Sequence, residues 1–232
     1  MSDDAIDQLK QAAGELAASW VESGMVVGLG TGSTAVHAIR AIGARIESGE
    51  LREVLGIPTS RASEAEAIVR NVPLTALTDH PVVDLTIDGA DDVDPALDLI
   101  KGAGGALWRE KMVAQASVRE VIVVDESKPS AQLGSNAVVP VEVAQFGWKP
   151  EAEYLDDLGA TVTVRRGADG AEYVTDEGNW ILDCAFGPIA DTARLAQRLD
   201  RRAGIVEHGL FLGLATDLLV AGANGVEHRT RP

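Results

Sequence analysis

The segment MVVGLGTGSTA (residues 25–35) has the pattern of a buried strand that turns directly into a helix. An apolar run is followed by small and hydroxyl residues, and a helix is then expected through about Glu47. Small residues let the backbone approach a ligand, and free N–H groups at a helix start attract anions. The turn is therefore a candidate phosphate site, with a tight turn capped by Ser or Thr as the alternative.

The turn differs from two common nucleotide-binding sequences. No lysine precedes its Ser or Thr as in a Walker loop, and its glycines at positions 28, 30 and 32 do not follow the G-x-G-x-x-G spacing. The hydroxyls of Thr31, Ser33 and Thr34 add hydrogen-bond donors suited to a small phosphate.

Further strand-like runs alternate with helical patterns along the first half of the chain. These runs are VLGIP (54–58), VVDLTID (82–88) and EVIVVD (120–125). Apolar strands that alternate with helices predict an α/β fold, here a Rossmann-like parallel sheet with helices on both faces.

The pattern changes after about Ser135, where strands begin to outnumber helices. Strands are expected in AVVPVEV, ATVTVRR, AEYVTD and NWILDCAF, and helices at 150–159 and 188–202. This combination indicates a small α+β unit of the split βαβ, ferredoxin-like kind. We predict a main α/β domain of residues 1–135 and 207–232, with the smaller domain at 136–206 inserted before the main domain's final strands in IVEHGLFLG and LATDLLVAG.

Composition argues against several classes of protein. The 232 residues carry a net charge of −16, whereas nucleic-acid binding needs clustered Lys and Arg. No apolar run is long enough to span a bilayer, and the start MSDDAIDQ does not resemble a signal peptide. The single cysteine, Cys184, excludes an intrachain disulfide and fits a reducing compartment. We expect a cytoplasmic protein without nucleic-acid or membrane partners.

The cations are strongly biased toward arginine. The sequence holds five Lys and 15 Arg against 36 acidic residues. An acidic surface with few lysines fits a protein that works at high salt, where screening weakens self-repulsion. Acidic enzymes from ordinary habitats are also common, so the composition leaves both interpretations open.

Four aspartates crowd the end of one predicted strand. In DLTIDGADDVD (84–94) they are Asp88, Asp91, Asp92 and Asp94. Open α/β sheets place ligands at the carboxyl ends of their strands, which makes this cluster a candidate site. The residues alone allow a metal site, a sugar site in which Asp binds hydroxyls and moves protons, or a solvated acidic loop.

A lysine and a glutamate follow the aspartates. In LIKGAGGALWREKMVA (99–114), Lys101 precedes a glycine-rich turn and Glu110 lies on the helix after it. A lysine beside backbone amides favours an oxyanionic ligand over a bare cation, although Glu110 alone could be an exposed neighbour of Lys111. Lys128, which ends VDESK, is either another anion contact or a surface charge.

Four motifs occur together in an order and spacing that resemble one enzyme family. GLGTGSTA (28–35), TIDGADDVD (86–94), LIKGAGGALWREK (99–111) and VVDESK (123–128) resemble the A type of ribose-5-phosphate isomerase. The resemblance extends from Lys10 in QLKQAAGELA to IVEHGLF near the end of the chain. It implies an aldose–ketose isomerase of the non-oxidative pentose phosphate pathway, which interconverts D-ribose 5-phosphate and D-ribulose 5-phosphate through a cis-enediolate. It also implies no metal, no cofactor, and a homodimer or homotetramer.

The resemblance assigns a role to each motif. Glu110 would be the base that accepts the proton at C2 and returns it to C1. Asp88 and Asp91 would bind sugar hydroxyls and assist ring opening, and Lys101 would stabilise the enediolate oxygen. The substrate-binding residues would be Lys10, Thr31, Gly32, Ser33, Thr34, Asp88, Gly89, Ala90, Asp91, Lys101, Gly102, Ala103, Gly104 and Lys128. Of these, the hydroxyl loop and the lysines at 10 and 128 would hold the phosphate.

Two functions of other classes remain open at this point. One is a sugar-phosphate-sensing domain that binds its ligand without chemistry, and the other is a CoA-transferase-like enzyme with a glutamate nucleophile. One assay distinguishes the three functions. Formation of ribulose 5-phosphate from ribose 5-phosphate in EDTA would indicate the isomerase, and binding of the sugar phosphate without turnover would indicate the sensor. A requirement for an acyl-CoA would indicate the transferase.

If the acidic surface is an adaptation to salt, the melting temperature should rise steeply with KCl up to molar concentrations. Ordinary screening is largely complete well below that range, because the Debye length is already about 10 Å at 0.1 M. Thermal unfolding followed from 0.2 to 2 M KCl checks this, and a flat melting temperature over that range would remove the halophile hypothesis.

Overall fold

The computed structural model describes residues 3–232, which divide into two compact units. The first unit comprises the described residues up to Ala90 together with Arg109–Lys128 and Leu214–Pro232. The second comprises Asp91–Trp108 and Pro129–Gly213. The smaller domain expected at 136–206 lies wholly inside the second unit, and its boundaries as a separate domain stay a prediction.

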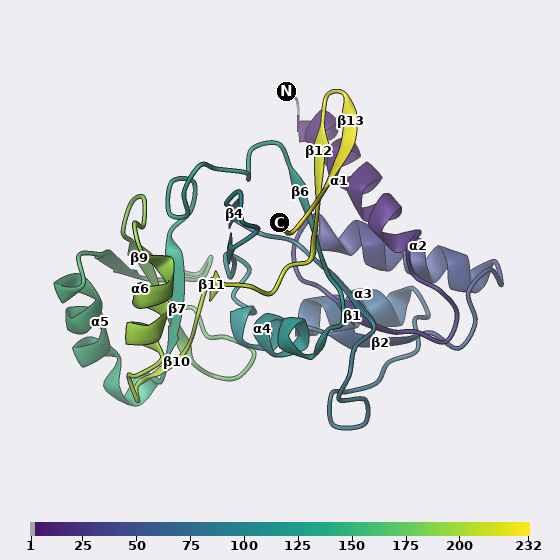
Figure 1. Ribbon diagram of the computed structural model, residues 1–232. Coiled ribbons are helices and arrows are strands. Elements are labelled where there is room, and N and C mark those ends of the chain that lie inside the picture. Colours follow the sequence, from purple (N-terminus) through teal and green to yellow (C-terminus); the bar gives the residue numbers. More distant parts are fainter. Residues whose placement is uncertain (1–2) are drawn as a thin grey trace. The chain divides into compact units, whose positions relative to one another are not determined.

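The first unit is built on a six-stranded sheet in the order β13-β12-β6-β3-β1-β2 (Figure 1). Its strands are β1 (Val26–Leu29), β2 (Leu55–Pro58), β3 (Leu85–Asp88), β6 (Glu120–Asp125), β12 (Asp217–Gly222) and β13 (Gly225–Thr230). All neighbouring pairs are parallel except β12 with β13. Every residue of β1, β3 and β6 is buried, as expected for strands covered on both faces.

Helices cover both faces of this sheet. The helices are α1 (Asp3–Ala18), α2 (Ala35–Glu47), α3 (Arg61–Val69) and α4 (Leu107–Ala116). Residues of α1, α2 and α3 share a buried cluster with Val27 of β1, whereas Val113 of α4 packs with Val26. Because successive strand residues point to opposite faces, α4 lies on the face opposite the other three helices. The predicted α/β fold is confirmed.

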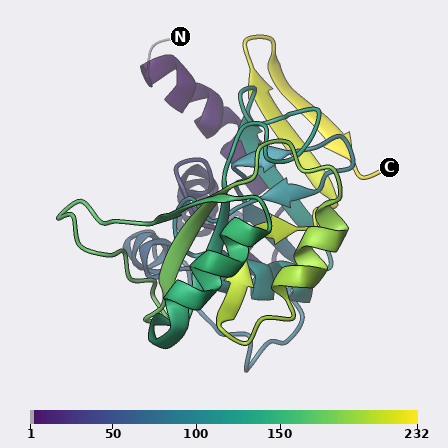
Figure 2. The same cartoon turned by 90° about the vertical axis from the view of Figure 1, so that its left-hand side faces the viewer.

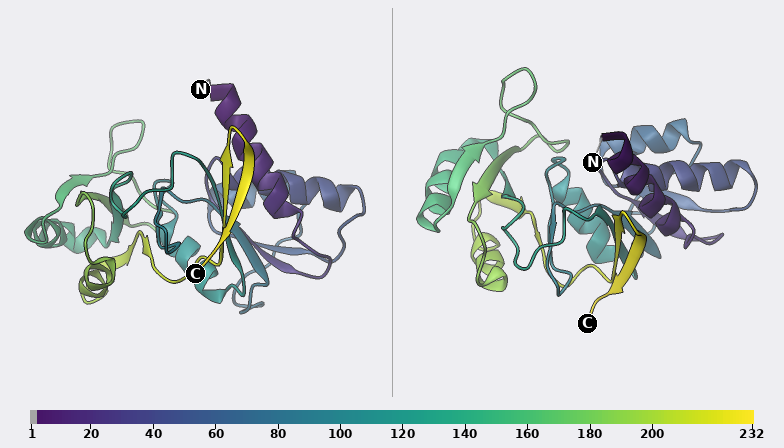
Figure 3. Two further views of the ribbon diagram at one scale, coloured as in Figure 1. Left: turned by 45° about the horizontal axis from the view of Figure 1, so that its top comes forward. Right: turned by 90° about the horizontal axis from the view of Figure 1, so that it is seen from above.

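The last strand of this sheet was not among the predicted strands. Residues 225–230 form β13, which pairs antiparallel with β12 through a two-residue loop between Gly222 and Gly225. Asn224 ends this loop and Gly225, with φ +107°, begins β13, and an Asn-Gly pair at such a position is a hairpin signal. The hairpin lies beside α1 in both views of Figure 3.

The second unit contains the predicted ferredoxin-like arrangement. It runs β7 (Val139–Val143), the 3₁₀ turn η1 (Gln145–Gly147), α5 (Trp148–Asp157), β8 (Thr161–Val164), β9 (Trp180–Ala185), α6 (Thr192–Leu199) and β10 (Ile205–His208). The sheet order is β10-β7-β9-β8 and every pair is antiparallel. Figure 2 shows α5 and α6 side by side over one face, where Leu155 and Leu199 pack with Leu182 and Cys184 of β9.

Two of the expected strands differ from the prediction. AEYVTD (171–176) makes only isolated bridges, because its backbone N–H groups are divided between two partners: Tyr173 bonds to Arg165 and Thr175 to Asn179. IVEHGLFLG does not return to the six-stranded sheet. Its first part is β10, and its second part is β11 (Leu210–Phe211), which joins β5 (Leu99–Ile100) and β4 (Asp92–Val93) in a small sheet of the second unit.

A charged cluster anchors the C-terminal hairpin to the first unit. The buried Asp217 carboxylate accepts hydrogen bonds from Arg119 (Nη2–Oδ1 2.7 Å) and Thr216 (Oγ1–Oδ2 2.7 Å), and His228 Nε2 lies 2.7 Å from Oδ1. Burial alone would raise the pKa of Asp217, but these hydrogen bonds outweigh it and hold the pKa well below its usual range. The Arg119 guanidinium also lies 4.2 Å above the Trp20 ring.

Replacing Asp217 with Asn should lower the free energy of unfolding at pH 7 by about 1–3 kcal/mol, because Arg119 loses its buried partner but stays partly exposed to water. Since folding lowers the pKa of Asp217, its contribution is present above the unfolded-state pKa of about 4 and is lost as the pH falls toward the folded-state pKa. Urea unfolding should show the difference between wild type and variant shrinking from pH 7 to pH 3. Glu227→Gln, which removes the exposed partner of Arg229 on the same hairpin, is the matched control and should change little. An equal fall in the free energy of unfolding in both variants would contradict this account.

Candidate active site

The strand order of the first unit identifies where a ligand is expected. Along β2-β1-β3-β6-β12 the order of the strands reverses between β1 and β3. In open parallel sheets, ligands bind outside the carboxyl ends of the strands at such a reversal. The loop at residues 30–34 follows β1 and Asp88 ends β3, so both lie at this position.

Asp88 ties the two strand ends together. Its fully buried carboxylate accepts hydrogen bonds at Oδ1 from the backbone N–H of Thr31 (3.0 Å) and of Gly89 (2.7 Å). A Cβ on Gly30 would lie 2.4 Å from the same oxygen, so only glycine allows this approach.

Thr31 is more fully engaged by the protein than the sequence suggested. Its hydroxyl lies 2.8 Å from Thr59 Oγ1 and 2.8 Å from Ser60 Oγ, and Ser60 in turn caps α3. These hydroxyls join the loop after β1 to the loop after β2. The capping serine at position 60 and its neighbour Thr59 were not among the predicted site residues, because their role depends on the pairing of β1 with β2.

A lysine of α1 contacts the rest of the loop. Lys10 of α1 donates a hydrogen bond to Ser33 Oγ (3.0 Å), and Thr34 is the buried N-cap residue of α2. Asp125 at the end of β6 was not predicted. Burial tends to raise its pKa, but hydrogen bonds from Ser127 and the positive charges of Lys128 and Lys10 outweigh this effect and lower it. Lys10 and Lys128 therefore act on one carboxylate, next to the hydroxyl loop.

Glu110 lies in the first turn of α4 and is 4% exposed, so it is not the exposed neighbour of Lys111 that the sequence allowed. It precedes Val113 by three residues and shares the helix face that packs on the sheet. Because α4 leads into the parallel strand β6, its first turn lies at the carboxyl ends of the strands. Asp88 and Glu110 thus belong to the same edge of the first unit.

In the second unit, Asp91 and the glycine-rich turn lie together. Asp91 N donates to Ile100 O (2.8 Å), and its Oδ2 accepts from Ala103 N (2.9 Å). Lys101 follows β5 and is 2% exposed, with its Nζ 5.5 Å from the centre of the Phe211 ring. Gly102 adopts φ +107°, which the turn requires.

The remaining aspartates of the cluster have structural roles. Asp92 Oδ2 accepts from the backbone N–H of Gly134 (2.9 Å) and of Asn136 (3.1 Å). Asp94 Oδ1 closes a turn by accepting from Ala96 N and Asp98 N. Among residues with described side chains, the one group of three metal-type ligands is Asp200, Glu207 and His208, which includes none of these aspartates.

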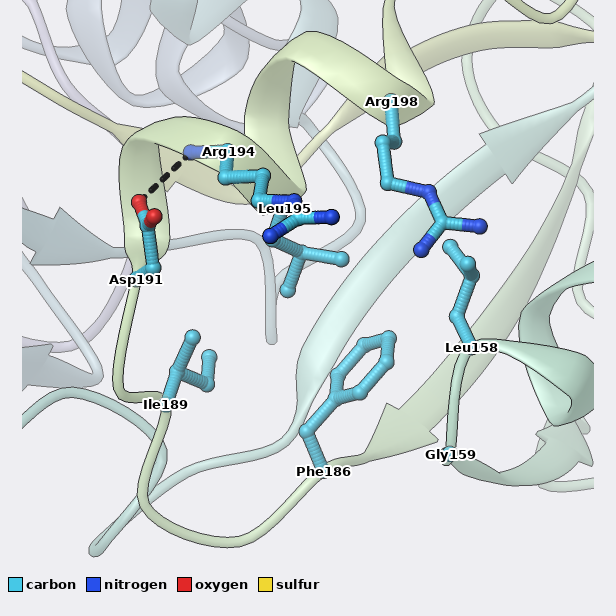
Figure 4. Close-up of a pocket in the computed structure, with 8 residues that line it drawn as sticks. All are labelled: Leu158, Gly159, Phe186, Ile189, Asp191, Arg194, Leu195 and Arg198. Atoms are coloured by element: carbon cyan, nitrogen blue, oxygen red, sulfur yellow. Dashed lines mark hydrogen bonds between the residues drawn. The ribbon is translucent and has the colours of Figure 1, made fainter.

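A pocket in the second unit, with a volume of about 230 Å³, lies apart from all predicted site residues (Figure 4). Leu158, Gly159, Phe186, Ile189, Asp191, Arg194, Leu195 and Arg198 line it. Asp191 is engaged as the N-cap of α6, where it accepts from Arg194 N (2.9 Å).

Comparison with known proteins identifies the family. The family model of ribose 5-phosphate isomerase A (phosphoriboisomerase A) matches residues 55–225. The chain belongs to this family. A ribose-5-phosphate isomerase A from Chloroflexus aurantiacus is 53% identical over 221 residues, which cover 95% of this chain and 92% of the relative.

Solved structures of the family match the fold closely. A D-ribose-5-phosphate isomerase in complex with phospho-erythronic acid superposes with a TM-score of 0.95 at 34% identity, covering 97% of this chain and 99% of that one. The ribose 5-phosphate isomerase A of Methanocaldococcus jannaschii superposes with a TM-score of 0.91 at 37% identity, covering 96% and 98%. In addition, none of the helices described here is long and apolar enough to cross a membrane.

Proposed function

We propose that this chain catalyses the interconversion of D-ribose 5-phosphate and D-ribulose 5-phosphate in the pentose phosphate pathway. Family membership supports the reaction, and the observation that carries the mechanism is the buried Glu110 carboxylate at the same sheet edge as Asp88. An aldose–ketose isomerisation needs one base that moves a proton between adjacent carbons, and a dry carboxylate is suited to that task.

Glu110 is assigned to the carbon-bound proton. It removes the proton from C2 of the open-chain aldose, which leaves a cis-enediolate, and it returns the proton to C1 while a proton moves from O2 to O1. Lys101 and the amides of the glycine-rich turn are assigned to the charge that develops on the enediolate oxygen. Charge stabilisation by groups fixed in advance is usually the largest contribution to such catalysis.

The two active-site aspartates are assigned different tasks. Asp88 Oδ1 accepts two backbone N–H groups, which hold the carboxylate in a fixed position and suit it to binding a sugar hydroxyl. Asp91 is partly exposed and accepts one backbone N–H at Oδ2. We therefore assign proton transfer during ring opening to Asp91.

The phosphate is assigned to Ser33, Thr34, Lys10 and Lys128. The hydrogen bond from Lys10 to Ser33 and the charge of both lysines on Asp125 support this assignment. A solved relative binds phospho-erythronic acid, which carries a phosphate and a carboxylate. These are the two kinds of anionic group that the proposed site is built to bind. We also expect a cytoplasmic homodimer or homotetramer that needs neither metal nor cofactor.

The double substitution of Ser33 and Thr34 by Ala should raise KM far more than it lowers kcat, because phosphate binding is largely common to the ground and transition states. Steady-state kinetics with ribose 5-phosphate measures the two effects separately, and Ser48→Ala at the other end of α2 is the control. A fall in kcat at constant KM would mean that the loop holds the reacting end of the sugar.

Replacing Glu110 with Gln should reduce kcat by about 10²–10⁴-fold with KM changed only a few-fold, since the amide keeps the shape but cannot accept a proton. Glu110→Asp should also be badly impaired, because near-attack geometry is sensitive to displacements of about 1 Å. Ribulose formation in EDTA gives the rates, and deuterium incorporation from D₂O follows the proton transfer.

Glu47→Gln, an exposed glutamate at the end of α2, is the matched control and should leave kcat unchanged. If Glu110→Gln keeps more than about a tenth of the wild-type kcat, Glu110 is not the base and Asp88 becomes the candidate.

A further inference from the structure

The glycine-rich turn after β5 is held by an arginine from a different part of the second unit. Arg165 Nη1 donates to Gly102 O (2.8 Å) and to Ala103 O (3.0 Å). The same guanidinium bonds to Asp183 through Nε (2.9 Å) and Nη2. One side chain thus contacts two successive carbonyls of the turn and one carboxylate, and its fork of donors suits that arrangement.

The position of Arg165 follows from the sheet. It comes directly after β8, and its N–H continues the ladder to Ile181 O of β9 (2.9 Å). Asp183 lies opposite Thr163, two residues before Arg165, so the two charged side chains are diagonal neighbours across the strands. Leu182 and Cys184 face α5 and α6, which places Asp183 on the face of the sheet without helices. The Arg165 side chain is only 14% exposed there.

These contacts fix the orientation of the peptide groups in the turn. In a trans peptide the C=O of one residue and the N–H of the next point in opposite directions. The carbonyl of Gly102 bonds to Arg165, and the N–H of Ala103 accordingly points the other way, to Asp91 Oδ2 (2.9 Å). The carbonyl of Ala103 also bonds to Arg165, so the N–H of Gly104 points away from the guanidinium as well.

The N–H of Gly104 has no hydrogen-bond acceptor among the residues that the structure describes, and Gly104 is exposed. The following peptide is held as well: Gly105 N donates to Gly102 O (3.0 Å), and Tyr173 Oη donates to Gly104 O (3.4 Å). A Cβ on Gly105 would lie 2.3 Å from that Tyr173 oxygen. One N–H donor is therefore presented on the Asp91 side of a turn that its other contacts keep rigid.

We propose that Arg165 is a positioning residue for the reaction: by binding the carbonyls of Gly102 and Ala103, it holds the Gly104 N–H in place as an oxyanion donor beside Asp91. The inference rests on the proposed function of the glycine-rich turn. Arg165 itself touches no substrate atom, and its effect reaches the reaction through the orientation of two peptide groups.

Replacing Arg165 with Met should lower kcat by about 10²-fold, the order expected when a catalytic group is misplaced by about 1 Å, with KM changed only a few-fold. Arg165→Lys keeps the charge but cannot reach both carbonyls and Asp183 together, so it should be nearly as impaired. Affinity for phospho-erythronic acid should fall, whereas affinity for inorganic phosphate should not. Added guanidinium chloride, at concentrations too low to unfold the protein, should restore part of the kcat of an Arg165→Ala variant.

Arg166→Met is the matched control, because Arg166 is the next residue and its exposed guanidinium bonds to Gly170 O and pairs with Glu172, away from the glycine-rich turn. It should retain wild-type kinetics and show no guanidinium rescue. The inference is overturned if Arg165→Met keeps the wild-type kcat and the wild-type affinity for phospho-erythronic acid. It is also overturned if the loss of kcat is accompanied by a lowered melting temperature and guanidinium does not restore kcat in Arg165→Ala. An inactive wild-type protein would instead contradict the proposed function, and the binding measurements would still test the role of Arg165.

Discussion

The buried carboxylate of Asp88 is the constraint on which the rest of the site depends. It is fully enclosed at the end of β3 and accepts the N–H groups of Thr31 and Gly89. A buried carboxyl group is costly unless hydrogen bonds satisfy it, so the loop after β1 must approach closely enough to supply them. That approach requires glycine at position 30. It also fixes the position of the loop that leads into α2, including Ser33, whose hydroxyl accepts a hydrogen bond from Lys10.

Local sequence patterns were sufficient to predict the elements that carry the chemistry. The strand-turn-helix at 25–47, the strand that ends at Asp88, and the helix that carries Glu110 are all encoded by residues close together in the chain. The order of strands in the sheet, and therefore the reversal between β1 and β3, depends on pairing between distant segments, which periodicity does not reveal.

The same distinction explains what was missed at the site. Arg165 appeared only as the end of an alternating strand, because its role depends on the register of β8 with β9 and on a turn more than 60 residues earlier in the chain. Asp125 looked like an ordinary strand end until the lysines at 10 and 128 were found to act on it. The separate roles of Asp92 and Asp94 likewise depend on which backbone N–H groups fold back onto them.

The connectivity of the two units also has a consequence for how the protein folds. The chain leaves the first unit after Ala90, returns at Arg109, leaves again after Lys128 and returns for the last time at Leu214. During synthesis β6 therefore has an open edge until β12, almost 100 residues later, emerges and pairs with it. Exposed strand edges promote aggregation, and non-local pairing slows folding. Residues Leu214–Pro232 thus supply the strand that covers the open edge of β6. A chain truncated before Leu214 would leave that edge of β6 unpaired.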